Sequence, residues 1–125
     1  MLGSSDLTVL VGTARFDEAR AFYREALGLT LVSEDPFAAV FDAHGTTLRL
    51  SKVEELTPQP FAVLGWSVAD IEGAVDALRE RGVAFERYPG MEQDDRGLWQ
   101  APGGPRIAWF RDPDGNTLSL TEAFA

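Results

Sequence analysis

An internal repeat constrains the fold of this chain more than any other feature of its sequence. The stretch DAHGTTLRL, starting at Asp42, matches DPDGNTLSL, starting at Asp112, with Asp, Gly, Thr, Leu and Leu in register. Two amphipathic helical patterns, residues 17–27 and 70–81, also correspond, and each is followed by a glycine, the residue that commonly ends a helix. Because both a helix and a strand–turn–strand segment recur, the sequence predicts a duplicated unit.

Apolar runs and turn residues predict the remaining elements. Alternating or continuous apolar stretches bounded by Gly, Pro, Asp or charged residues are typical of strands. We expect strands at 7–11, 29–32, 37–41, 47–51, 61–68, 83–88, 107–110 and 117–121, with a short edge strand at 98–100. The prolines and charges of residues 52–60 predict a linker. The expected fold is therefore α+β, a single domain (1–125) of two tandem βαβββ modules, 7–51 and 61–122.

Composition excludes several function classes. The chain has 125 residues, no cysteine and a formal net charge of −9. Without cysteine there are no disulfides and no zinc–cysteine sites. The acidic balance argues against nucleic-acid and anionic-membrane partners; it serves solubility, or it helps recruit a cationic ligand. No apolar run is long enough to span a bilayer, and a cytoplasmic location is expected.

Few residues carry obvious catalytic chemistry. His44 is the one imidazole, and it falls in a predicted turn without a carboxylate or nucleophile to work with. Asp112 and Asp114 flank Pro113 and precede Gly115, which is the pattern of a tight turn in which Asp side chains accept backbone hydrogen bonds. Neither a phosphate-binding Gly-rich loop nor a nucleophile elbow is present. We assign no catalytic residue.

Aromatic residues on the predicted strands are more informative. Trp66 and Trp109 belong either to the core or to a ligand cleft, because alternation alone does not say which face of a strand is buried. Trp99 lies in a polar Gly/Pro-rich stretch, which favours contact with a ligand or a second chain. Arg49 and Arg106 either face the cleft, where they would bind an anionic or carbonyl group, or lie in solvent.

Three segments together carry a family resemblance. FYREALGL in the first module, and VADIEGAVDALRERGV and FRDPDGNTLSL in the second, resemble the vicinal oxygen chelate superfamily over Leu7 to Glu122. This group contains glyoxalase I, extradiol dioxygenases, and the fosfomycin- and bleomycin-resistance proteins. The resemblance implies curled mixed sheets around a shared cleft, with the helices outside, and a homodimer.

The positions that hold the metal ligands in that superfamily carry other residue types in this chain. The resemblance places them, two per module, at four positions of this chain, which are Thr8, Arg49, Val63 and Ser119. None of these is an imidazole or a carboxylate, the groups that hold divalent ions. We therefore expect no metal and no other cofactor.

Two functions follow from these expectations. The first is a metal-independent protein that binds, and sequesters, a toxic or aromatic small molecule. The alternative is a lyase, isomerase or dioxygenase with displaced metal ligands. The residues expected to form the cleft are Thr8, Phe41, Arg49, Val63, Gly65, Trp66, Trp99, Arg106, Trp109 and Ser119.

Overall fold

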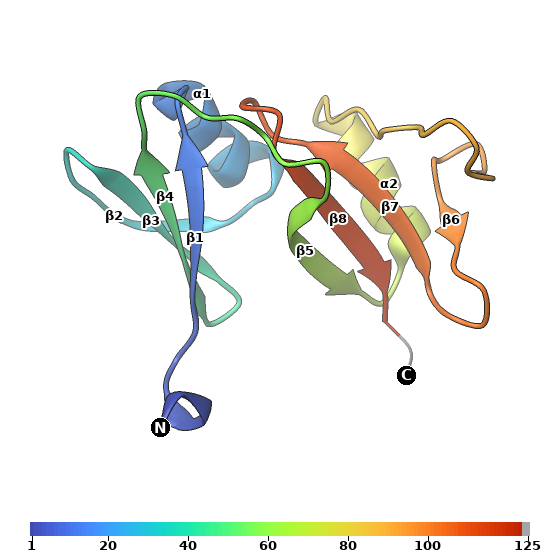
Figure 1. The fold of residues 1–125 in the computed structure, drawn as a ribbon, viewed down its shortest axis with the longest axis horizontal. Helices are drawn as coiled ribbons and strands as arrows, with labels where there is room; N and C mark the ends of the chain where they lie inside the picture. The colour runs from blue at the N-terminus through green and yellow to red at the C-terminus, as the bar shows by residue number, and fades with distance from the viewer. Residues whose placement is uncertain (124–125) are drawn as a thin grey trace. The chain divides into compact units, whose positions relative to one another are not determined.

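The chain forms two compact units in a computed structural model that describes residues 1–123. The first is Met1–Thr57 and the second begins at Pro58. Each unit contains one open four-stranded sheet, with strand orders β1-β4-β3-β2 and β5-β8-β7-β6 (Figure 1). The two orders are the same, and in each the first strand of the unit pairs in parallel with its last. The predicted duplication is confirmed at the level of topology, and the fold is α+β.

The first unit follows the predicted order of elements. After a short 3₁₀ turn at Leu2–Ser4 come β1 (Thr8–Thr13), α1 (Phe16–Ala21), β2 (Thr30–Glu34), β3 (Ala38–Ala43) and β4 (Thr46–Lys52). The core between the helix and the sheet is built from fully or nearly fully buried side chains, which are Val11, Ala19, Tyr23, Ala39, Phe41, Leu48 and Leu50.

The first helix differs from the expected continuous α-helix. Its second half, Phe22–Ala26, is a π-helical turn, in which the Leu27 N–H donates to the Phe22 carbonyl at 3.0 Å. Neighbouring rings occupy this turn: Phe22 and Tyr23 meet edge to face at 5.5 Å, and Tyr23 also packs against Phe41 at 6.3 Å. The amphipathic pattern of the sequence does not distinguish this wider turn from a regular one, because both bury the same face.

The second unit contains β5 (Ala62–Val68), α2 (Ile71–Glu80), β6 (Trp99–Gln100), β7 (Arg106–Arg111) and β8 (Thr117–Glu122). Asp70 caps α2 as predicted, since its carboxylate accepts from the Gly73 N–H at 3.0 Å. The helix packs on one face of the sheet, against β8 (Figure 1). This leaves the opposite face, which we call the open face, free of helices.

The strand expected at residues 83–88 is wrong. Val83 is buried, but the segment touches the sheet only through one bridge, Phe85 to Phe110, and the Glu86 N–H, which donates to the Trp109 carbonyl at 2.8 Å. Two segments share this edge of β7, because β6 pairs with its first half and residue 85 bridges its second half. The short edge strand predicted at 98–100 is confirmed as β6, and residues 86–98 form an irregular loop.

No helix within residues 1–123 has the length and apolar character needed to cross a membrane.

Candidate functional site

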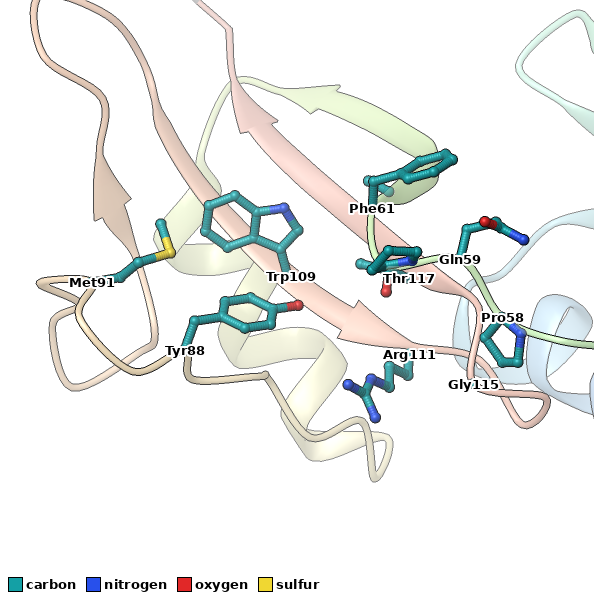
Figure 2. A pocket seen from close by; sticks show the side chains of 11 residues that line it. Pro58, Gln59, Phe61, Tyr88, Met91, Trp109, Arg111, Gly115 and Thr117 are labelled. Carbon is teal, nitrogen blue, oxygen red and sulfur yellow. The ribbon is translucent and has the colours of Figure 1, made fainter.

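A cavity of about 590 Å³ lies within the second unit. Its size is typical of small-molecule sites. Four segments form it: the chain leading into β5, the loop after residue 86, the end of β7 and the start of β8 (Figure 2). The lining residues are Pro58, Gln59, Pro60, Phe61, Ala62, Tyr88, Met91, Trp109, Arg111, Gly115 and Thr117.

Strand register explains why Trp109 faces this cavity. Trp109 pairs with Ser119, and Ser119 pairs with Gly65 across the next strand. Directly paired residues project from the same face of a sheet. The neighbours in sequence, Phe110 and Leu118, are fully buried on the helix side, so Trp109 belongs to the open face.

Trp109 forms the centre of an aromatic wall. Tyr88 meets it edge to face, with ring centroids 5.7 Å apart and an interplanar angle of 81°. Trp99 also packs against Trp109, with ring centroids 6.1 Å apart and an interplanar angle of 41°. Figure 2 shows Tyr88 and Met91 beside the indole, with Phe61 across the cavity. Rings arranged in this way offer flat, apolar surface to a planar ligand.

Gln93 fixes the loop that carries Tyr88. Its Oε1 accepts from the Tyr88 N–H at 2.8 Å, while its Nε2 donates to the Glu86 carbonyl at 3.0 Å and the Gly97 carbonyl at 2.8 Å. Gly97 has φ of 87°, a conformation that favours glycine. One half-buried amide thus satisfies three backbone groups of an otherwise irregular segment.

The polar end of the cavity is formed by Arg111 and Thr117, which are cross-strand partners on β7 and β8. The Arg111 Nε lies 3.3 Å from Oε1 of Glu86. Among residues 1–123, Glu86 is the one carboxylate that forms an ion pair with this guanidinium, which has five N–H donors.

The turn between β7 and β8 holds these two residues in register. The Asp112 carboxylate accepts from the N–H groups of Asp114 (3.0 Å) and Asn116 (2.9 Å) and from the Asn116 side-chain amide (2.9 Å). Gly115 has φ of 88°. The interpretation of Asp112 and Asp114 as turn residues is confirmed, and Gly115 brings the turn against the ring of Pro58.

Tyr88 carries the cavity's phenol. Burial raises its pKa above the ordinary value of 10.0; the Glu86 carboxylate acts in the same direction, and Arg111 acts against both. Because the shift is upward, the hydroxyl keeps its proton at neutral pH and is a hydrogen-bond donor.

The structure shows which face of the sheet Trp66 and Trp109 occupy, a question that the sequence left open. Trp66 pairs with Leu120, and its ring stacks on Phe110 at 6.4 Å, so it belongs to the helix-side core. Trp109 is on the open face. Trp99 packs against Trp109 from β6 and does not line the cavity itself.

Arg106 does not face the open side, and it does not line this cavity. Its Nη2 donates to Glu122 Oε2 at 2.6 Å, and its Nη1 lies 3.7 Å from Glu72 on α2. The pKa of Glu122 is lowered by this hydrogen bond. Arg106 is a link between the helix and the sheet, on the side away from Trp109.

The other expected cleft residues fall outside the cavity. Phe41 is fully buried in the first unit's core, and has no surface to offer a ligand. Thr8 and Arg49 lie on β1 and β4 of that unit. Val63, Gly65 and Ser119 lie on β5 and β8, beside the cavity lining but not part of it.

Gly65 and Ser119 are in unusually close contact. A Cβ atom at residue 65 would lie 2.6 Å from the Ser119 Oγ and 3.2 Å from its carbonyl oxygen. Side-chain atoms do not approach so closely, so the serine occupies the space that only glycine leaves.

Several site residues were missed at the sequence level. These are Phe61, Tyr88, Met91, Arg111 and Thr117, together with the prolines assigned to the linker. The one available signal was the spacing of Trp109 and Arg111, which are two residues apart on a strand and therefore share a face. Tyr88 and Met91 had no such signal, because they reach the site from an irregular loop.

Residues 7–120 match the Glyoxalase/Bleomycin resistance protein/Dioxygenase superfamily. The chain belongs to this superfamily, and the resemblance read from its motifs is confirmed. A search of curated proteins finds no match.

Solved structures show the same fold. A superfamily member from Sphaerobacter thermophilus DSM 20745 is 25% identical, with a TM-score of 0.74, over 98% of this chain and 100% of that one. Lactoylglutathione lyase from Agrobacterium tumefaciens is 18% identical, with a TM-score of 0.75, over 96% of this chain and 94% of that one. A glyoxalase/bleomycin resistance protein/dioxygenase from Alicyclobacillus acidocaldarius is 20% identical, with a TM-score of 0.71, over 98% and 93%.

Proposed function

We propose that this protein is a metal-independent small-molecule binding protein that sequesters an aromatic compound. The observation that carries the proposal is the cavity of about 590 Å³ beside Trp109, Tyr88 and Phe61. An aromatic ring buried among such side chains gains from the apolar area removed from water and about 0.5–1.5 kcal/mol more per ring–ring contact. Bleomycin resistance, one of the activities for which the superfamily is named, is consistent with a binding role.

The donor groups support metal independence. The four positions that the family resemblance assigns to metal ligands are Thr8, Arg49, Val63 and Ser119. A valine has no donor atom, and a cationic arginine opposes the binding of a cation. Within the described part of the chain, no three His, Asp or Glu side chains gather in a way that would hold a metal ion.

Nuclear magnetic resonance of the indole N–H groups tests the proposal directly. The chain has three tryptophans. A bound aromatic compound should shift the indole signal of Trp109 most, that of Trp99 less, and that of Trp66, on the opposite face, least. The variant Trp109→Phe identifies the signal and should weaken binding. A panel of aromatic acids, cationic antibiotics and neutral phenols that leaves the Trp109 signal unmoved would refute the proposal.

A homodimer and a cytoplasmic location complete the proposal. Several large apolar side chains are exposed in the single chain, among them Leu10 (70%), Val32 (62%) and Phe37 (73%), and a second copy would cover such surface. The absence of cysteine suits a reducing compartment. Sedimentation equilibrium at micromolar concentration should give the mass of two chains, and the mass of one chain would count against the dimer.

A further inference from the structure

We propose that the ligand of this cavity is a planar aromatic compound carrying one carboxylate, which Arg111 binds. The inference rests on the proposed function and names its ligand class. Arg111 is the one charged side chain among the eleven residues that line the cavity. A ligand that enters the cavity therefore meets a positive group and no negative one in the lining.

The polar side chains at this end are chiefly donors. The two terminal nitrogens of Arg111 carry four N–H groups in a planar fork, which matches the two oxygens of a carboxylate. The Tyr88 hydroxyl keeps its proton, and no group within residues 1–123 accepts it. Thr117 adds a second hydroxyl from the paired strand. A carboxylate, which only accepts, complements this set.

The spacing of ring and charge fits a single small molecule. Trp109 and Arg111 are two residues apart on β7, so their Cα atoms are about 6.6 Å apart on the same face. In Figure 2 the Tyr88 ring and the Arg111 side chain both lie below the indole. A ring packed on Trp109 would thus carry its acid group directly to Arg111.

Glu86 is the internal competitor for Arg111. Its carboxylate lies 3.3 Å from the arginine Nε but does not line the cavity. The guanidinium has five N–H donors, more than this one carboxylate takes, so donors remain for a ligand. Because both groups are partly exposed, this ion pair is weak and does not cancel the arginine's attraction for a ligand in direct contact.

The overall charge of −9 does not contradict an anionic ligand. Exposed charges farther away than the Debye length, about 8 Å at physiological salt, are largely screened. The direct contact with Arg111 therefore decides which charge the cavity prefers, while the remote carboxylates act mainly on the rate of encounter.

Three probes with the same ring and different charge test the inference. Naphthoate is anionic, naphthamide is neutral and naphthylmethylammonium is cationic, and each is titrated into the 125-residue chain by isothermal calorimetry. We expect naphthoate to bind about tenfold or more tightly than naphthamide, the usual scale for hydrogen bonds to a charged group, and the cation to bind most weakly. The Trp109 indole signal should shift with naphthoate.

Two variants move the affinity in opposite directions. Arg111→Met should remove the preference for naphthoate and leave naphthamide binding nearly unchanged. Glu86→Gln keeps the side-chain shape and removes the competing charge, so naphthoate should bind more tightly and naphthamide should not. Arg111→Lys, which keeps the charge without the fork, should give an intermediate affinity.

The outcomes separate this inference from the proposed function. Equal or tighter binding of naphthamide to the unmodified protein would overturn the carboxylate assignment while leaving an aromatic binding site in place. Naphthoate binding that survives in Arg111→Met with an undiminished preference would also overturn it. If none of the three probes binds, the aromatic binding function fails, and the inference fails with it.

Discussion

Replacing Gln93 tests whether one amide organises the loop beside the cavity. Its side chain makes three hydrogen bonds, to the Tyr88 N–H and to the carbonyls of Glu86 and Gly97. Gln93→Ala removes all three and leaves the backbone groups of a half-buried loop without these partners. At about 1 kcal/mol for each net hydrogen bond, the variant should lose about 2–3 kcal/mol of unfolding free energy.

Gln93→Glu is the matched control, because it keeps the size and the acceptor of the side chain. Its second oxygen would face the two carbonyls that the amide now donates to, which disfavours the charged form and raises the pKa of the new carboxyl. A raised pKa in the folded state means that stability is present below the unfolded value and lost as pH rises through the folded value. The unfolding free energy of Gln93→Glu should therefore be lower than that of the wild type at pH 7 and should approach the wild-type value near pH 4.

Urea unfolding followed by tryptophan fluorescence, at both pH values, measures these differences. Binding of the aromatic probes should fall in Gln93→Ala, since Tyr88 loses its anchor. An unfolding free energy within about 0.5 kcal/mol of wild type, the usual range for surface substitutions, would refute the argument that this amide supports the loop.

Three further predictions concern other parts of the molecule. Gly65→Ala should cost about 1–3 kcal/mol by overpacking against the Ser119 Oγ, and Ser119→Ala in the same chain should restore part of the loss; additive losses in the double variant would contradict the contact. The hydrogen bond from Arg96 lowers the pKa of Asp76 below its ordinary value of 3.8. The pair therefore stabilises the fold above pH 3.8, and this stabilisation is lost as the pH falls through the pKa of the folded state. In Asp76→Asn the unfolding free energy should fall less steeply as the pH is lowered in the acid range. An unchanged pH dependence would refute this assignment. Calorimetry with manganese, nickel or zinc should detect no stoichiometric binding; tight binding would favour the enzyme function instead.

Local chemistry made much of the fold predictable. The cap at Asp70 and the turn at Asp112 depend on neighbours within four residues, so their residue types suffice to predict them. The repeat then assigns the same topology to both units. The strand expected at residues 83–88 failed because pairing is decided at long range: this segment keeps only one bridge to β7, at Phe110, and β6 pairs with the first half of the same edge.

The candidate site was less predictable, for the same physical reason. A strand has a period of two, so its sequence separates two faces without saying which one the helix covers. Register with β8 decided that Trp66 packs on the core and that Trp109 faces the cavity. The two arginines of β7 also have different surroundings: Arg106 forms an ion pair with Glu122, and Arg111 lines the cavity.

The amino-acid sequence by itself determined the duplicated modules, because the repeat is visible as matching residues in the two halves. It also determined the helix caps and the tight turns, because these arise from interactions between residues close together in the chain. Only the tertiary structure decided the cavity. Tyr88 and Met91 come from an irregular loop, and Phe61 from the segment before β5. They meet Trp109 only after strands far apart in the sequence have paired, and the alternation within any one strand carries no record of that pairing.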